Sequence, residues 1–176
     1  DFDMSLKSMV DKLGAKPVAL QIPVGAEDTF RGVVDLIKMK ALLWEGDAKG
    51  QTYDTVEIPA DLAEKAKRMR DAMLEACMEF DDTVLHKYLD GQPVAEDEIR
   101  LCLRKGTLTG KIVPALCGSS FKNRGVQPLL DAIVHLLPSP LDMPPVRGTA
   151  PDGESKLERT CSDDEPFCGL AFKIAV

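Results

Sequence analysis

The chain has 176 residues, of which 44% are hydrophobic and 29% are charged. That composition suits one domain of ordinary size with an apolar core and a charged surface, and it argues against a disordered tail. A formal net charge of −7 disfavours nonspecific binding of nucleic acid, because phosphate contacts need clustered Lys and Arg. No segment is apolar over the length of a membrane span, and the N-terminus lacks the pattern of a signal peptide. We therefore expect a cytoplasmic protein with no membrane partner.

The five cysteines are odd in number and never occur as Cys-x-x-Cys, which is typical of reduced thiols rather than of a disulfide framework. His86 and His135 each lie in a helical pattern without a ligand-spaced His or Cys beside them. A metal site is therefore not predicted. No paired nucleophile and base occur either, so the sequence predicts no catalytic residue.

Strands are predicted in the first third of the chain. Two runs rich in β-branched and apolar residues, 17–25 and 32–44, are separated by a turn region at 25–28, and both favour β-structure. The segment 45–55 is polar and contains glycine, and 53–58 is predicted to pair as another strand. This part of the chain is therefore expected to form a sheet.

A long amphipathic helix is predicted to follow over 60–89, opened by Pro59 and Asp61. Its apolar residues recur at steps of three or four, namely Leu62, Ala66, Met69, Met73, Cys77, Phe80 and Val84. Acidic residues occupy the opposite side of this predicted helix, namely Asp71, Glu75, Glu79 and Asp82. Such an acidic ridge is ordinarily a solvated face that keeps the protein soluble. A shorter helix over 96–104, ended by Gly106, is expected next.

Residues 111–140 predict a strand, a Gly-Ser-Ser turn and a helix that ends at a proline. In open α/β sheets, ligands bind where the carboxyl ends of strands meet the following turns. Gly118, Ser119 and Ser120 therefore lie where a nucleotide or a phosphate would bind. By itself the tripeptide is more typical of a tight turn in which glycine supplies a positive φ. The basic residues at 122–124 favour a polar cap of the helix.

Beyond Pro138 the chain is rich in proline, which predicts a linker. The run 166–176 then begins a β pattern.

Residues 116–149, LCGSSFKNRGVQPLLDAIVHLLPSPLDMPPVRGT, resemble the end of the GTP-binding domain of bacterial-type elongation factor G, the ribosomal translocase. Further blocks resemble the same family in the same order. They are 13–44 (LGAKPVALQIPVGAEDTFRGVVDLIKMKALLW), 58–62 (IPADL), 87–91 (KYLDG) and 163–176 (DDEPFCGLAFKIAV). Several long matches in register are far more specific than any single motif.

The resemblance implies an α/β fold, in which the end of a P-loop-type GTPase domain carries an α+β insertion with a mixed sheet and a long amphipathic helix. The first strand of a β-barrel domain would follow. The implied boundaries are 1–15 for the segment after the guanine-selecting motif, 16–109 for the insertion, 110–140 for the end of the GTP-binding domain, 141–162 for a linker and 163–176 for the start of the second domain.

The resemblance also implies a nucleotide-binding role for Gly118, Ser119, Ser120, Phe121 and Lys122. The family's fifth guanine-nucleotide motif is Gly-Ser-Ala followed by an apolar residue, Lys and Asn. The Ser119 side chain and the Ser120 N–H would hold the guanine carbonyl, and the stem of Lys122 would stack against the base. Ser120 replaces the family's usual alanine, a change that leaves the backbone donor in place.

Three other parts of a guanine-nucleotide site are missing from the sequence. There is no G-x-x-x-x-G-K-[ST] loop, no Asp-x-x-Gly suited to sensing a γ-phosphate, and no Asn-Lys-x-Asp. The family has all three upstream of the point that corresponds to Asp1. The chain is therefore expected to be an inactive fragment with no bound cofactor, whereas the parent protein would hydrolyse GTP with Mg²⁺ and release GDP.

The resemblance further implies a ribosomal partner. In the family, an insertion in the GTP-binding domain presents an acidic helix to the C-terminal domain of the ribosomal stalk protein, and other parts contact ribosomal RNA. The predicted helix at 60–89 matches that helix in position, so Glu75, Glu79 and Asp82 are the implied stalk contacts. Complementary surface charge of this kind gives a weak, salt-sensitive contact.

Two alternatives stay open. A related ribosome-protection or release-type translational GTPase would share the nucleotide turn, although the match over 13–44 counts against it. A stand-alone interaction module with an acidic helix would need no nucleotide, although the turn at 116–123 counts against that.

Overall fold

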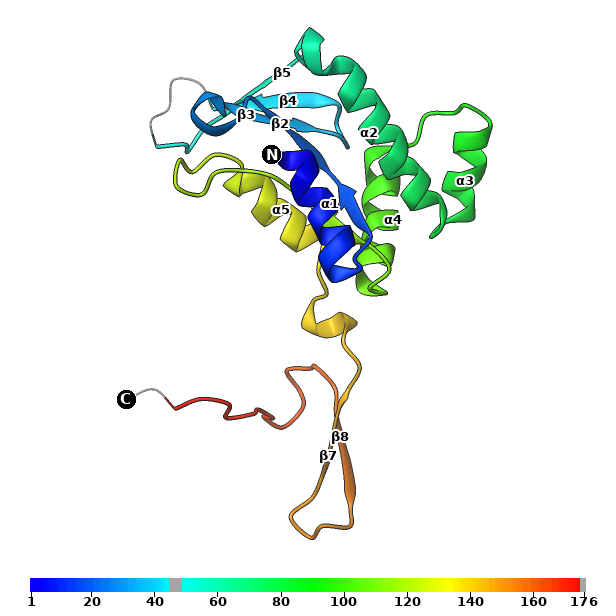
Figure 1. Ribbon diagram of the computed structural model, residues 1–176. Helices are drawn as coiled ribbons and strands as arrows, with labels where there is room; N and C mark the ends of the chain where they lie inside the picture. The colour runs from blue at the N-terminus through cyan, green and yellow to red at the C-terminus, as the bar shows by residue number, and fades with distance from the viewer. Residues whose placement is uncertain (45–48, 175–176) are drawn as a thin grey trace. The chain divides into compact units, whose positions relative to one another are not determined.

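The computed structural model describes residues 1–44 and 49–174. The chain divides into two compact units, Asp1–Leu137 and Pro138–Val176. The first unit mixes helices with small sheets (Figure 1), which agrees with the expected mixture of α and β structure. Among the described residues, no helix combines the length and the hydropathy needed to cross a membrane.

A four-stranded antiparallel sheet forms where the β-branched runs predicted it. Its strands, in spatial order, are β2 (Gln21–Val24), β3 (Gly32–Asp35), β4 (Lys40–Leu43) and β5 (Asp54–Val56). Side chains alternate between its faces. Val34 and its partner Ala41 belong to the main core, whereas Val33 and its partner Leu42 pack into a second cluster with Trp44. Both faces of the sheet are therefore covered.

The predicted strand at 17–25 serves two sheets. Its first part, β1 (Pro17–Ala19), pairs in parallel with β6 (Val113–Ala115), and its second part is β2 of the antiparallel sheet. Parallel neighbours need a long crossover, and here the described part of the crossover contains the whole antiparallel sheet, the short 3-10 helix η1 (Glu27–Thr29) and three α-helices. One continuous segment thus ties the sheet to the strand that precedes the Gly-Ser-Ser turn.

The helix predicted over 60–89 is two helices, so that prediction was wrong. α2 (Ala60–Met78) ends before Phe80, and α3 (Asp82–Leu89) begins after the N-cap Asp81. The backbone of Asp81 is extended, with φ −157°, and its carboxylate accepts a hydrogen bond from the Thr83 N–H at 3.0 Å. An N-cap of this kind satisfies a free donor of the new helix. The apolar stripe continues across the break because Phe80 and Val84 still face the core.

Asp81 also forms an ion pair with Lys105, at 2.7 Å. The hydrogen bond from Lys105, together with that from the Thr83 N–H, lowers the pKa of Asp81 below its ordinary value of 3.8. A carboxyl whose pKa is lower in the folded state stabilises the fold above its unfolded pKa, and this contribution is lost as the pH falls through the folded pKa. The contact should therefore stabilise the fold at neutral pH and not in strong acid.

We expect Asp81→Asn to lower the melting temperature at neutral pH, because asparagine keeps the N-cap and loses the ion pair. The difference from wild type should shrink as the pH falls below 3.8. Lys105→Met should behave in the same way. Thermal melts followed by circular dichroism over a pH series would test this, and a difference that persisted unchanged in acid would contradict it.

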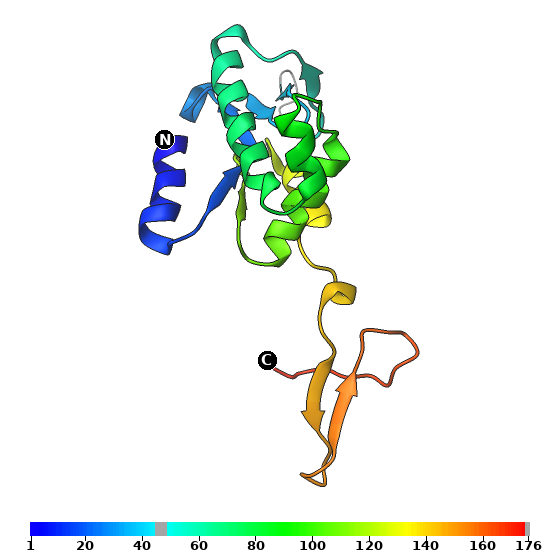
Figure 2. The same cartoon turned by 90° about the vertical axis from the view of Figure 1, so that its right-hand side faces the viewer.

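The helix predicted over 96–104 is longer, because α4 (Glu96–Leu108) runs past Gly106. Gly106 does not end the helix but packs inside it. A Cβ atom built on Gly106 would lie 2.7 Å from the Phe80 ring and 2.8 Å from Ile112. The missing side chain thus lets α4 approach its neighbours closely. α2 packs against both α3 and α4 (Figure 2).

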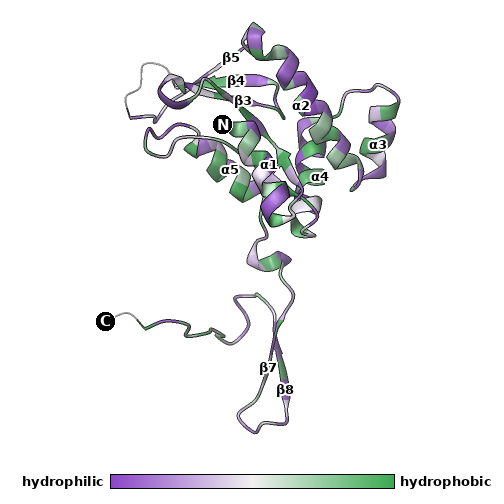
Figure 3. Ribbon diagram, viewed as in Figure 1, coloured by the Kyte–Doolittle hydropathy of each residue, from purple (hydrophilic) through white to green (hydrophobic). Residues whose placement is uncertain are grey.

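Two helices accompany the parallel pair. α1 (Phe2–Leu13) begins at the N-cap Asp1 and ends at Gly14, whose φ of 61° is left-handed. α5 (Val126–Leu136) follows β6, as the sequence predicted. Figure 3 colours much of α5 as hydrophobic. Leu136 is buried, whereas several other apolar residues of α5 are exposed in the described structure. Its most exposed apolar residue is Val134, at 77%.

The second unit contains a hairpin where a linker was expected. β7 (Val146–Thr149) pairs antiparallel with β8 (Lys156–Arg159), and the short helix η2 (Pro140–Asp142) precedes them. The Asp152 carboxylate accepts hydrogen bonds from the N–H groups of Glu154 and Ser155 at 3.0 and 2.9 Å, which fixes the connecting turn. The linker predicted over 141–162 is therefore partly structured.

The strand predicted over 163–176 is wrong for the described residues 163–174, which contain no strand. The last two residues of that prediction lie outside the described part. A strand needs a paired neighbour, and this segment has none among the described residues. Its apolar side chains are consequently open to solvent, with Phe167 and Phe172 exposed by 99% and 89%.

Candidate functional site

The predicted nucleotide-contacting residues lie together in one turn, residues 118–125, between β6 and α5. Two backbone hydrogen bonds close this 118–125 turn. The Ser119 N–H donates to the Arg124 carbonyl at 2.8 Å, and the Arg124 N–H donates to the Ser119 carbonyl at 2.9 Å. The Asn123 N–H donates to the Ser120 carbonyl at 3.0 Å and tightens the tip. The turn is thus a small closed structure that follows the carboxyl end of a strand.

Two glycines make this closure possible. A Cβ on Gly118 would lie 2.8 Å from the Arg124 carbonyl oxygen, and one on Gly125 would lie 3.0 Å from the Cys117 carbonyl oxygen. The left-handed residues are Gly125, with φ 86°, and Asn123, with φ 51°. The expectation that the glycine of Gly-Ser-Ser supplies the positive φ was therefore wrong. Gly118 is needed for space rather than for its backbone angle.

The tip of the turn offers an unused donor. Within the part of the chain that the structure describes, the Ser120 N–H has no acceptor, and the Lys122 ammonium has no ion-pair partner. The Ser119 hydroxyl accepts the Lys122 N–H at 3.4 Å, which leaves its own proton free to donate. Phe121 is 98% exposed. The arrangement can therefore bind a carbonyl or another acceptor through Ser119 and Ser120.

Cys117, directly before the turn, is not a reactive thiol. Burial raises its pKa to about 12, so the thiol stays protonated at neutral pH and is a poor nucleophile. Its side chain packs against the cluster of Phe30, Val33, Leu42 and Trp44.

The acidic residues do not form one continuous ridge. Glu75 is exposed on α2, Glu79 is the C-cap of that helix, and Asp82 opens α3. The helix dipole favours Asp82 at an N-terminus and disfavours Glu79 at a C-terminus. Glu79 is compensated by Lys16, whose ammonium lies 2.5 Å from its carboxylate. The predicted contacts thus flank the break between two helices.

Basic residues interrupt the acidic surface of α2, a feature that the periodicity of the acidic residues alone did not indicate. Lys67 and Arg68 line one shallow depression together with Glu64, Asp71 and Glu75. Helical spacing could have indicated it, since each of these residues has another of the set three or four positions away along α2. The surface around the predicted contacts is therefore mixed in charge, since Glu79 is itself paired with Lys16 and Asp81 with Lys105.

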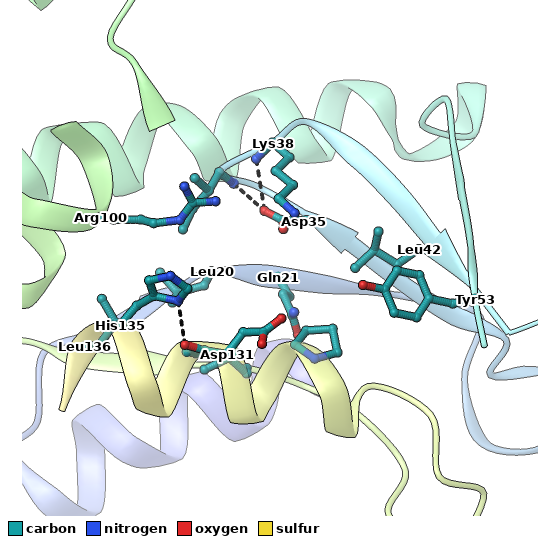
Figure 4. A pocket seen from close by; sticks show the side chains of 14 residues that line it. Leu20, Gln21, Asp35, Lys38, Leu42, Tyr53, Arg100, Asp131, His135 and Leu136 are labelled. Carbon is teal, nitrogen blue, oxygen red and sulfur yellow. Dashed lines mark hydrogen bonds between the residues drawn. The ribbon is translucent and has the colours of Figure 1, made fainter. Parts of the chain in front are cut away.

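A cavity lined by both polar and apolar side chains lies between the antiparallel sheet and α5 (Figure 4). Arg100 is paired with Glu96 at 2.9 Å, Asp35 accepts the N–H groups of Ile37 and Lys38, and His135 Nδ1 lies 2.6 Å from the Asp131 carbonyl oxygen. These groups are largely engaged with their own helix or turn. The described residues contain no group of three His, Cys, Asp or Glu suited to a metal ion.

No family model matches the chain. Among solved structures, it is similar to a protein from Thermus thermophilus known as ttk003000868, with a TM-score of 0.68 and 28% sequence identity. The match covers 82% of this chain and 22% of the Thermus chain, so this chain spans about a fifth of the length of the protein that it resembles. That name carries no activity, and the similarity supports a mixed α and β fold without assigning a function.

Proposed function

We propose that the chain is a segment of a translational GTPase of the elongation factor G type. The segment supplies one guanine-contacting turn and a docking surface for the ribosomal stalk protein. The single observation that carries the proposal is the closed 118–125 turn, whose Ser120 N–H has no acceptor among the described residues, in the sequence context of 116–149. The match to only 22% of a longer solved chain agrees with a segment. In the parent protein, GTP hydrolysis with Mg²⁺ drives translocation of tRNA and mRNA.

The chemistry of the turn explains how it distinguishes bases. Guanine carries a carbonyl where adenine carries an amino group. The Ser120 N–H and the Ser119 hydroxyl can both donate to the guanine carbonyl. The Ser120 N–H can only donate, so it would face the adenine amino group as a second donor. Leaving a desolvated donor without an acceptor costs more free energy than a single hydrogen bond contributes when it forms, so the adenine nucleotide is disfavoured. The stem of Lys122 covers one face of the base.

Nucleotide binding tests this proposal directly. The chain holds one side of a guanine pocket and no phosphate loop, so we expect GDP to bind it no better than about millimolar, roughly −4 kcal/mol. A longer protein that adds a phosphate loop and an Asn-Lys-x-Asp motif upstream of Asp1 should bind GDP in the micromolar range or tighter. Isothermal titration calorimetry with Mg²⁺ measures both. Micromolar binding by the 176-residue chain alone would contradict the proposal.

The coding sequence upstream of Asp1 gives an independent test. The proposal requires an Asn-Lys-x-Asp motif a few codons before Asp1. A related ribosome-protection or release-type GTPase would also contain it, whereas a stand-alone interaction module would lack it.

A further inference from the structure

The 118–125 turn is held from one side by a loop that is distant in sequence. We define the Gly50 loop as residues 49–51, which lie between β4 and β5. The Asn123 side-chain amide donates to the Lys49 carbonyl at 2.8 Å. The Gln127 side-chain amide donates to the carbonyls of Gly50 and Gln51 at 2.8 and 3.2 Å. The tip of the 118–125 turn and the first turn of α5 are thus hydrogen-bonded to the backbone of the Gly50 loop, which lies in the connection between two strands of the antiparallel sheet.

The two backbones also touch. Gly50 is buried and left-handed, with φ 64°, and a Cβ built there would lie 2.4 Å from the Asn123 carbonyl oxygen and 2.8 Å from that of Lys122. A contact this close leaves no room for any side chain at position 50. The Gly50 loop therefore limits where the tip of the turn can lie.

A third contact comes from the connection between β2 and β3. The Arg124 guanidinium donates to the Phe30 carbonyl at 2.5 Å. Hydrogen bonds from a charged donor are stronger than neutral ones. The side of the turn formed by Asn123 and Arg124 is therefore bound to the sheet, while the Ser120 N–H on the other side keeps no acceptor among the described residues.

We propose that Gly50, Asn123 and Gln127 are positioning residues, which hold the 118–125 turn so that the Ser120 N–H stays aimed at the guanine carbonyl. The holding of the turn follows from the contacts alone, and its effect on guanine rests on the proposed function. The antiparallel sheet then has a role in base selection, because its loop sets the position of the base-contacting donor. No residue of the loop needs to touch the nucleotide.

The first experiment measures the holding of the turn in this chain, without nucleotide. Gly50→Ala and Gly14→Ala form a matched pair, because both glycines have a φ near 60° and only Gly50 has a close neighbour. We expect Gly50→Ala to speed amide hydrogen exchange at Ser119 and Arg124 by about tenfold or more, the loss of one to two hydrogen bonds. Gly14→Ala should leave both rates unchanged. Equal rates in the two variants would overturn the proposal.

A milder pair guards against misfolding of the glycine variant. Gln127→Glu keeps the size of the side chain. It replaces the amide N–H that donates to the Gly50 and Gln51 carbonyls with a carboxylate oxygen, which can only accept. Gln92→Glu makes the same chemical change in an exposed loop. The positioning role predicts faster exchange at Ser119 and Arg124 in Gln127→Glu but not in Gln92→Glu. Identical exchange in the two variants would overturn it.

The second experiment reads out base selection in the longer protein that binds GDP. Gln127→Glu should weaken GDP about tenfold, the value of one to two hydrogen bonds, and leave unchanged the affinity for the diphosphate of 2-aminopurine riboside, which lacks the carbonyl. A merely structural defect would weaken both nucleotides equally, and that outcome overturns the effect on guanine. If the unaltered longer protein binds no GDP, the proposed function fails, and the exchange rates still decide whether the turn is held.

Discussion

Gly32→Ala is expected to destabilise the unit Asp1–Leu137 by about 3 kcal/mol, at the upper end of ordinary overpacking. Gly32 is buried in β3, opposite Leu43 of β4. A Cβ built on it would lie 2.0 Å from the Leu42 carbonyl oxygen and 3.0 Å from the Leu42 carbonyl carbon. Both are backbone atoms of the neighbouring strand, so the new methyl group can be accommodated only if the two strands separate. Urea denaturation of the purified chain measures the loss.

Gly106→Ala is the comparison variant, since it adds the same methyl group at a place where the close neighbours are side chains rather than backbone. Its close neighbours, at 2.7 and 2.8 Å, are side-chain atoms of Phe80 and Ile112, which can shift more easily than the backbone of a paired strand. Alanine also favours a helix interior over glycine by about 1 kcal/mol. We therefore expect a stability within about 1 kcal/mol of wild type, because the two effects oppose each other. An equal loss in both variants would show that the backbone neighbour of Gly32 has no special importance.

The strands β1 to β4 were predictable because burial on both faces demands apolar, β-branched residues in short runs. The runs 17–25 and 32–44 and the segment 53–58 each contain the strands that the structure has there. The sequence could not show that the first run is shared between two sheets. That division depends on β6, which lies far along the chain and pairs with Pro17–Ala19.

The break between α2 and α3 was missed for a physical reason. Helical periodicity reports which side chains face the core, and Phe80 and Val84 continue to do so across the break. The available signal was Asp81, an N-cap residue followed by the acidic Asp82. The helix end expected at Gly106 failed in the opposite way, because there glycine serves close packing rather than termination.

The position of the 118–125 turn was predictable from the sequence, but the hydrogen bonds that hold it in place were not. A strand followed by glycine, serine and an amphipathic helix predicts a turn at the end of the strand, and the 118–125 turn lies there. The bonds from Asn123 and Gln127 reach carbonyl groups more than seventy positions earlier in the chain. Every residue has a carbonyl group, so sequence patterns carry no mark of which carbonyl is used. The pairing of Glu79 with Lys16 was hidden for the same reason.

Charge reversal at Glu75, Glu79 and Asp82 to lysine is expected to abolish binding of the stalk protein's C-terminal domain, under the proposed function. All three side chains are exposed, so the apolar core of α2 and α3 stays intact. Loss of the Glu79–Lys16 pair should matter little, because an exposed pair contributes about 0–1 kcal/mol. Opposite charge chiefly speeds encounter and sets orientation, and reversal turns that attraction into repulsion. NMR titration with the labelled chain measures binding.

A second triple variant separates position from net charge. Asp11, Asp28 and Glu154 are exposed acids outside α2 and α3, and their replacement by lysine changes the net charge of −7 by the same amount. If the surface around the α2–α3 break is the docking site, this control keeps its chemical-shift changes and the first variant loses them. Raised salt should weaken wild-type binding as well, because exposed charges are screened. Equal loss of binding in both triple variants would show that the contact is only nonspecific charge attraction. If the wild-type chain does not bind, these acids are a solvated surface without a docking role.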